Sequence, residues 1–235
     1  MKELVFDIET VGYPFESFDE YQQEYILRFA SQAESEEIRS RRSEEAIRYL
    51  NLSPLTAQIV AIGVYDINNS KGLVLFQSES KEKFKSENGE FTFASGDEKF
   101  LLEKFWLIVK NYSRFITFNG RNFDVPFLLL RSAILRIKPS INLMGYRFDS
   151  KLHCDLLEQF TFYGILRKYN LDFYCKVFGI ESPKRGEITG FNINEYFIQK
   201  KFREIAEYCC KDLIATKELY LIFKKYLSFD RNERT

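Results

Sequence analysis

The chain opens with the run Leu4 to Thr10 (LVFDIET), in which apolar residues surround two acidic residues. Such a run, rich in branched and aromatic side chains, predicts a β-strand. Alternate side chains of a strand leave the same face, so Asp7 and Glu9 would lie next to each other. Taken alone, the pair is also compatible with the exposed face of an edge strand.

Two later stretches carry acidic residues that could join this pair, and the run His153 to Asp155 (HCD) lies between them. The segment Asn119 to Asp124 (NGRNFD) is a turn signal followed by an acidic residue, where a helix could begin. Tyr208 and Asp212 are four positions apart, which places them on one face of a helix. Alone, the first could be a helix cap and the second a solvated face. Carboxylates that gather repel one another unless cations lie among them, so together they favour a divalent-metal site and phosphodiester chemistry.

The composition limits how such a site could meet nucleic acid. The 235 residues are 45% hydrophobic and include 34 basic and 34 acidic residues, which gives no net charge. Proteins that coat DNA without regard to sequence usually carry a basic excess. A nucleic-acid partner would therefore be held locally, with bound metal supplying much of the positive charge.

The hydrophobic pattern predicts an α/β fold in a single domain over residues 1–235. Asp97 is a plausible N-cap, and polar composition between positions 78 and 96 suggests a loop. Further strands are expected at 58–65, 73–76 and 115–118, and helices at 97–111, from about 124, and over about 194–226 with a break inside.

The segment 18–50 differs from its surroundings, because Gln, Glu, Arg and Ser dominate it. Its few apolar residues recur on one helical face, which predicts one or two exposed helices inserted after the first strand. Two roles are open: a solvated surface insert, or a flap that grips the substrate through Arg39, Arg41 and Arg42.

The four cysteines form no C-x-x-C pair, and two of them are adjacent. Reduced, buried thiols are the simpler interpretation, and they fit a reducing compartment. The sequence shows neither a signal peptide nor an apolar run of about 18 residues. These features predict a soluble, cytoplasmic protein without a membrane segment.

The three acidic stretches, in this order, resemble the exonuclease motifs of the DEDD 3′–5′ exonucleases. Asp7 and Glu9 match the first motif, Asp-x-Glu, and the segment 119–124 matches the second. The third motif is present in its tyrosine form, since the histidine form would need His where this chain has Glu207. The chain is most similar to the stand-alone predicted exonucleases related to the proofreading domain of family B DNA polymerases, over Leu4 to about Leu221.

The resemblance implies a ribonuclease H-like fold, a mixed β-sheet flanked by helices, with the carboxylates meeting at one edge of the first strand. It also implies a two-metal hydrolysis with two Mg²⁺ or Mn²⁺ ions, which prefer oxygen ligands. One ion would lower the pKa of a water that Tyr208 orients, and the other would stabilise the leaving 3′ oxygen. The implied metal ligands are Asp7, Glu9, Asp124 and Asp212.

The expected substrate is the 3′ end of single-stranded DNA, cut to 5′-mononucleotides. An exoribonuclease, or an inactive nuclease-like module that binds nucleic acid, are the alternatives. No polymerase domain follows in the sequence, so proofreading would occur in trans, with an unknown polymerase partner. The expected substrate contacts are Thr10, Asn119, Phe123, Lys184 and Arg185.

Three of these residues have plain structural interpretations as well. Phe123 is equally well explained as a core residue, and Lys184 with Arg185 as a solvated turn. His153, the only histidine, is expected to be structural and is not assigned as a catalytic base.

Overall fold

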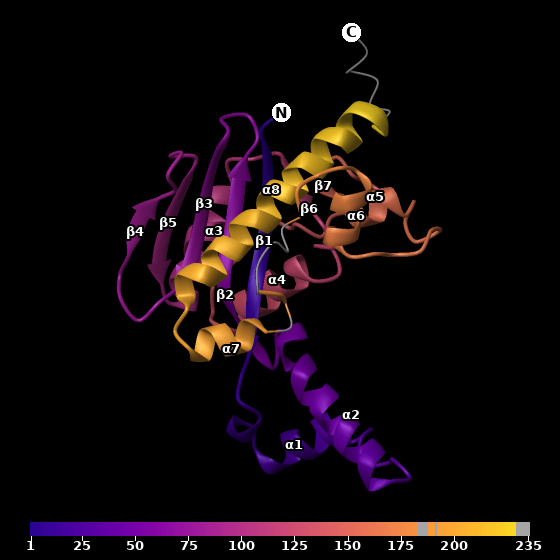
Figure 1. Ribbon diagram of the computed structural model, residues 1–235. Helices are drawn as coiled ribbons and strands as arrows, with labels where there is room; N and C mark the ends of the chain where they lie inside the picture. Colours follow the sequence, from indigo (N-terminus) through magenta and orange to yellow (C-terminus); the bar gives the residue numbers. More distant parts are fainter. Residues whose placement is uncertain (183–187, 191, 229–235) are drawn as a thin grey trace.

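A computed structural model describes residues 1–182, 188–190 and 192–228, and within them the chain forms one mixed sheet (Figure 1). The strand order is β4-β5-β3-β2-β1-β6-β7, so β1 is an internal strand, antiparallel to β2 and parallel to β6. The strands are β1 (Glu3–Gly12), β2 (Ala57–Asp66), β3 (Lys71–Gln77), β4 (Lys83–Lys85), β5 (Phe91–Gly96), β6 (Arg114–Thr117) and β7 (His153–Asp155).

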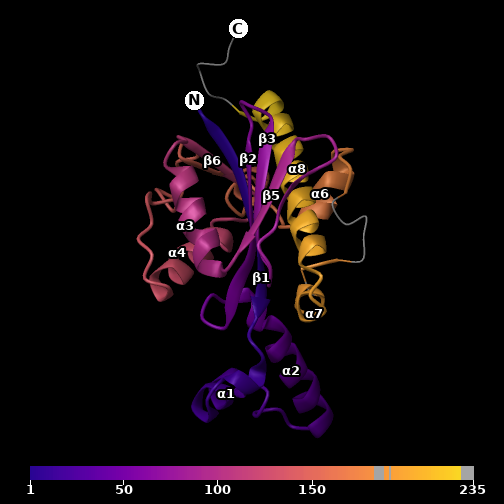
Figure 2. The same cartoon turned by 90° about the vertical axis from the view of Figure 1, so that its left-hand side faces the viewer.

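Helices cover both faces of this sheet, which confirms the predicted α/β architecture. Figure 2 shows α3 and α4 on one side, and α6, α7 and α8 on the other. The helices are α1 (Glu20–Leu27), α2 (Glu36–Arg48), α3 (Glu98–Val109), α4 (Asp124–Ile134), α5 (Leu156–Phe160), α6 (Leu171–Val177), α7 (Ile193–Ile198) and α8 (Phe202–Tyr226), with 3-10 turns at Phe15–Ser17 and Tyr49–Leu52.

The alternation along β1 divides the hydrophobic core in two. Leu4, Phe6 and Ile8 pack with residues of α3 and α4, whereas Val5 and Val11 pack with residues of α8. The odd-numbered side chains, which include Asp7 and Glu9, therefore lie on the α8 side. Because β1 is internal, the edge-strand interpretation of this acidic pair is wrong.

The missing side chain of Gly63 lets α8 approach β1 and β2 closely. Gly63 pairs with Asp7 across the two strands. A Cβ atom at position 63 would lie 2.5 Å from Cδ1 of Leu213 and 2.8 Å from Sγ of Cys209, both on α8. The sheet therefore needs glycine at the point where α8 crosses the acidic part of β1.

The segment 78–96, which composition predicted to be a loop, instead forms β4 and β5. Phe91 and Phe93 alternate with half-buried residues and are themselves almost fully buried. The strand they form pairs in parallel with β3. The polar composition of the segment gives no sign of this pairing, which depends on a contact with another strand. The loop prediction is wrong for this reason.

Two other local predictions are confirmed. The Asp97 side chain caps α3 by accepting a hydrogen bond of 2.8 Å from the backbone nitrogen of Phe100. The predicted break in the last helical stretch separates α7 from α8, and Lys200 there has a positive φ of 59°.

The segment between β1 and β2 forms an arm, α1 with α2, that extends beyond the end of the sheet (Figures 1 and 2). No residue of either helix is buried, as predicted for an exposed insert. A buried ion pair, Arg131 with Glu98 at 2.6 Å, holds the base of the arm. The guanidinium also donates to the Tyr13 hydroxyl before the arm and to the Pro54 carbonyl after it.

Two features bear on the expected environment of the protein. All four cysteines are free thiols, as predicted. Within the described residues, no helix combines the length and the apolar character needed to cross a membrane.

Adding one methyl group at position 63 tests the close approach of α8. We expect Gly63→Ala to lower the free energy of unfolding by about 1–3 kcal/mol, because the new Cβ overpacks the contact with α8. Urea denaturation measures the change. Gly190→Ala is the matched control, since a Cβ there meets no atom within 4 Å among the described residues. Equal stability of the two variants would contradict the expectation.

Candidate active site

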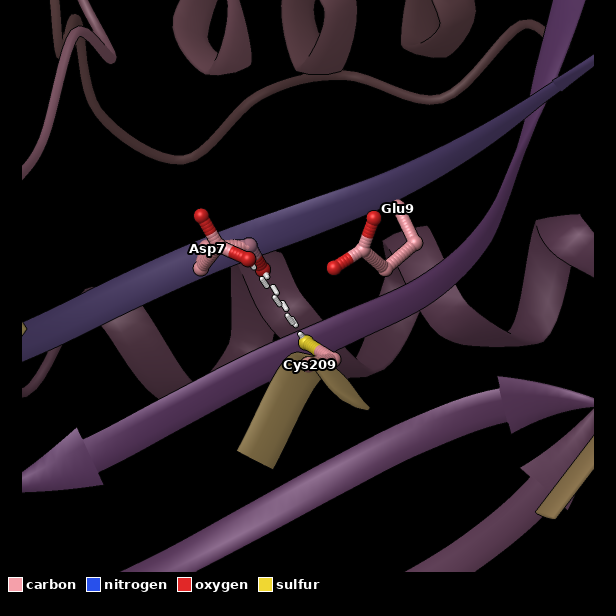
Figure 3. A group of neighbouring side chains, drawn as sticks. All are labelled: Asp7, Glu9 and Cys209. Carbon is pink, nitrogen blue, oxygen red and sulfur yellow. Dashed lines mark hydrogen bonds between the residues drawn. The ribbon is translucent and has the colours of Figure 1, made fainter. Parts of the chain in front are cut away.

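Asp7 and Glu9 extend from β1 toward α8, where the thiol of Cys209 lies beside them (Figure 3). One oxygen of each carboxylate and the sulfur all lie within 4.8 Å of one another. The Glu9 side chain is buried, whereas Asp7 is partly exposed. Consecutive same-face positions of one strand thus bring two carboxylates together, as the sequence predicted.

Asp124 joins this pair from the first residue of α4. Its carboxylate accepts a hydrogen bond of 3.1 Å from the backbone nitrogen of Ile8, which lies between Asp7 and Glu9. The side chain is 3% exposed. One hydrogen bond therefore connects the start of α4 directly to the acidic part of the first strand.

A carboxylate that the motif analysis left without a role holds the turn before Asp124. Asp155, fully buried at the end of β7, accepts hydrogen bonds of 2.9 Å from the backbone nitrogens of Asn119 and Arg121. It also caps α5 through the nitrogen of Leu157. An Asp that ends a strand and precedes a helix is the signal that would have identified this role.

Tyr208 and Asp212 complete the group from one face of α8. The phenol is 8% exposed and bonds to the Asp212 carboxylate. Burial, followed by the nearby charges of Glu9 and Asp212, raises the pKa of Tyr208 well above its usual value. The hydroxyl therefore keeps its proton at neutral pH.

The four carboxylates strongly affect one another's ionisation. Burial first, and then the charges of Asp124 and Asp212, raise the pKa of Asp7 far above its usual value. Burial and the other three carboxylates do the same to the pKa of Glu9. For Asp124, burial is the largest cause of a pKa raised from 3.8 to about 8.

This arrangement fits a divalent cation. Oε1 of Glu9 is buried and has no hydrogen-bond partner among the described residues, so it is free to bind a positive ion. The oxygen ligands favour hard cations such as Mg²⁺ and Mn²⁺. A cation would also offset the burial and the mutual repulsion that raise the carboxylate pKa values.

The predicted substrate contacts lie in different surroundings. Thr10 follows Glu9, is 4% exposed, and donates its hydroxyl to the Asn51 carbonyl at 2.7 Å. Asn119, with a positive φ of 66°, is half-buried in the turn before Asp124. Their contacts with a substrate remain predictions.

The other three predicted contacts divide into two cases. Phe123 is half-buried against the α3–α4 side of the core, with its ring 5.1 Å from that of Phe127. Lys184 and Arg185 lie outside the described residues. The structure thus shows the core packing of Phe123, and a substrate role for any of the three stays a prediction.

His153 has the structural surroundings that the sequence predicted. It is 1% exposed, and its Nδ1 lies 3.1 Å from the Leu143 carbonyl, which can only accept a hydrogen bond. Its Nε2 therefore accepts from the Thr117 hydroxyl at 2.8 Å. Burial lowers the pKa of His153 to about 3, so the ring is neutral.

Comparison with known proteins places this geometry in a family context. Residues 52–232 match a family model described as "Predicted 3'-5' exonuclease related to the exonuclease domain of PolB". The matched range includes Asp124, Tyr208 and Asp212, and it begins after β1 and the arm.

Curated relatives include two archaeal polymerases. The chain is 25% identical over 162 residues to DNA polymerase 1 of Sulfolobus acidocaldarius, covering 62% of this chain and 18% of that protein. It is 28% identical over 162 residues to DNA polymerase 1 of Saccharolobus solfataricus, covering 63% of this chain and 17% of that protein. The aligned region thus spans less than a fifth of each relative.

A solved structure supports the fold. The family B DNA polymerase from the hyperthermophilic archaeon Pyrobaculum calidifontis is similar with a TM-score of 0.59 at 17% identity, over 95% of this chain and 24% of that chain. At this identity the likeness shows the fold alone. It confirms the predicted ribonuclease H-like mixed sheet.

The raised pKa values predict how pH and metal affect stability. For Asp124 the folded-state pKa of about 8 exceeds the ordinary 3.8, so the fold binds this proton more tightly than the unfolded chain does. That stabilisation is present below about pH 4 and is lost as the pH rises toward 8. We therefore expect the metal-free protein to lose stability over this window.

Divalent cations should reverse this loss. At a concentration 100 times the dissociation constant measured at pH 8, one bound Mn²⁺ should stabilise the protein by about 2.7 kcal/mol at that pH. The same concentration should stabilise it less at pH 5, where protons compete for the carboxylates. Asp7→Asn should lose most of this gain, yet unfold at a higher temperature than wild type in EDTA at pH 8. Thermal unfolding measures both effects, and a metal gain independent of pH would contradict the expectation.

Proposed function

Since this chain belongs to the family of predicted 3′–5′ exonucleases related to the exonuclease domain of PolB, we propose that it removes nucleotides from the 3′ end of single-stranded DNA. The observation that carries the proposal is the meeting of four carboxylates and one tyrosine at the α8 side of β1. The reaction is phosphodiester hydrolysis that releases 5′-mononucleotides.

Each acidic residue has a task in this reaction. Asp7, Glu9 and Asp212 would hold one divalent ion, and Asp7 with Asp124 the second. When bound, the two ions lower the pKa of a water and stabilise the leaving 3′ oxygen. The hydrogen bond from the Ile8 nitrogen keeps Asp124 directed at this pair of sites.

Tyr208 would orient the attacking water. In the metal-free protein, burial and then the charges of Glu9 and Asp212 raise the pKa of Tyr208, so the phenolate is scarce at neutral pH. A protonated phenol can still donate a hydrogen bond that fixes the water. This supports the assignment to the tyrosine branch of the DEDD exonucleases.

The substrate is held without an overall basic surface. The protein has no net charge, and the segment 18–50 carries eight acidic and five basic residues, a net charge of −3. This net negative charge does not favour binding of substrate phosphates by the arm as a whole.

We propose one exonuclease domain over residues 1–235, with Lys184 and Arg185 as local phosphate contacts.

The defining experiment is a time course on 5′-labelled single-stranded DNA and RNA with Mg²⁺ or Mn²⁺. We expect a ladder that shortens by one nucleotide at a time from the 3′ end. Asp7→Ala should abolish it, because the residue is proposed to hold both ions. Asp149→Ala, at an exposed loop position, is the control.

The outcomes separate the rival functions. A faster ladder on RNA would identify an exoribonuclease, whereas metal binding without cleavage of either strand would indicate a binding module. Metal-dependent cleavage that persists unchanged in Asp7→Ala would refute the proposed site.

Removing a single hydroxyl tests the role of Tyr208. We expect Tyr208→Phe to lower kcat about 10²-fold, because one hydrogen-bond donor to the reacting water is lost. Its metal-dependent gain in thermal stability should remain, since the phenol is not proposed as a metal ligand. Tyr146→Phe, with a ring that is 71% exposed, is the matched control. Wild-type kcat in Tyr208→Phe would count against an orienting role.

A further inference from the structure

The thiol of Cys209 lies inside the acidic group, although the proposed reaction gives it no task. The residue is fully buried on α8, directly after Tyr208. Its Sγ is 3.9 Å from Oδ2 of Asp7 and 3.9 Å from the backbone oxygen of the same residue (Figure 3). A buried sulfur thus contacts one of the carboxylates proposed to bind metal.

A second observation shows that this position is able to receive a ligand. The Glu9 side chain is 6% exposed, and its Oε1 has no hydrogen-bond partner within the described part of the chain. Figure 3 shows that the Glu9 carboxylate points into the space beside Asp7 and Cys209. One sulfur and two carboxylate oxygens therefore lie within 4.8 Å of one another.

The chemistry of this donor set differs from that of oxygen ligands alone. Mg²⁺ and Mn²⁺ favour oxygen, whereas thiolate sulfur selects softer ions such as Zn²⁺ and Cd²⁺. With Zn–S near 2.3 Å and Zn–O near 2.0–2.2 Å, a tetrahedral site separates sulfur from oxygen by about 3.5 Å. The observed 3.9 Å between Sγ and Oδ2 of Asp7 is close to this separation, and the pairs that include the Glu9 oxygen start from within 4.8 Å.

We propose that Cys209, Asp7 and Glu9 form a site for a thiophilic divalent cation, Zn²⁺ or Cd²⁺, that overlaps the position of the catalytic ion. Binding forms a metal–sulfur bond and releases the thiol proton to solvent, with no change in oxidation state. Because two of its ligands are shared, the thiophilic ion excludes Mg²⁺ and inhibits the enzyme. Only this inhibition rests on the proposed function; the binding itself does not.

The neighbouring cysteine provides a matched control. Cys210 is half-buried, and the charged groups that act on it are Glu90, Glu207 and Lys211, none of them in the acidic group. A serine at position 210 removes a thiol from the same turn of α8 and leaves the proposed site intact. If the loss of a thiol merely destabilised α8, the effect would appear in both Cys209→Ser and Cys210→Ser.

Direct metal binding is the primary test. Cd²⁺ is titrated into the reduced, full-length protein, and the ultraviolet charge-transfer band of a cadmium-bound thiolate is recorded. We expect a saturable band of one ion per chain in wild type and in Cys210→Ser, and its loss in Cys209→Ser and Cys209→Ala. Thermal unfolding establishes that the variants are folded, and the alanine variant serves if the serine variant is not.

Two results would overturn the proposal: a wild-type protein without the band, or a band that persists in both folded Cys209 variants. Excess Mg²⁺ should weaken the band, and failure to do so would remove the claim that the two sites overlap. Asp7→Asn should weaken Cd²⁺ binding by at least about tenfold. An unchanged affinity would exclude the aspartate as a ligand.

An activity assay then tests the inhibition. The Zn²⁺ concentration that halves exonuclease activity should rise at least about tenfold in Cys209→Ser and stay unchanged in Cys210→Ser. Equal Zn²⁺ sensitivity in all three proteins would overturn the inhibitory claim. A cadmium band in a protein that cleaves neither DNA nor RNA would refute the proposed function while the thiophilic site stands.

Discussion

The burial and the mutual repulsion of the clustered carboxylates are the constraint on which this structure depends. Asp7, Glu9 and Asp124 all have raised pKa values, because burial and mutual charge oppose their ionisation. A fold that holds such groups together without a cation loses stability as they ionise. The surrounding contacts therefore have to keep the carboxylates in place. A bound cation would reduce the repulsion between them.

Three contacts provide that support, and each comes from a different part of the chain. The nitrogen of Ile8 binds Asp124, and the buried carboxylate of Asp155 holds the turn that precedes it. On the opposite side, Gly63 lets α8 lie directly against β1 and β2. The close packing of α8 against β1 brings Tyr208 to the carboxylates and also places the Cys209 thiol beside Asp7. The proposed thiophilic site would therefore result from the same packing that positions the tyrosine.

The arm is joined to this site through its base. Asn51, at the end of the arm, accepts the Thr10 hydroxyl through its carbonyl, and the buried pair of Arg131 and Glu98 fixes both of its connections. Removing one partner of such a buried pair would leave an uncompensated charge, so these contacts hold the base of the arm even though α1 and α2 are exposed. Acidic residues outnumber basic ones in the arm, so the charge of the arm as a whole does not favour binding to phosphate groups.

The sequence by itself determined the features that depend on local spacing. Alternation put Asp7 and Glu9 on one face, an i,i+4 spacing did the same for Tyr208 and Asp212, and Asp97 marked the start of α3. Only the tertiary structure decided what depends on contacts between distant segments. These are the pairing of β5 with β3, the hold of Asp155 on the turn before Asp124, and the position of Cys209 beside Asp7. Residues far apart in sequence come into contact only when the sheet and α8 pack together. A local sequence pattern carries no information about which distant segments make these contacts.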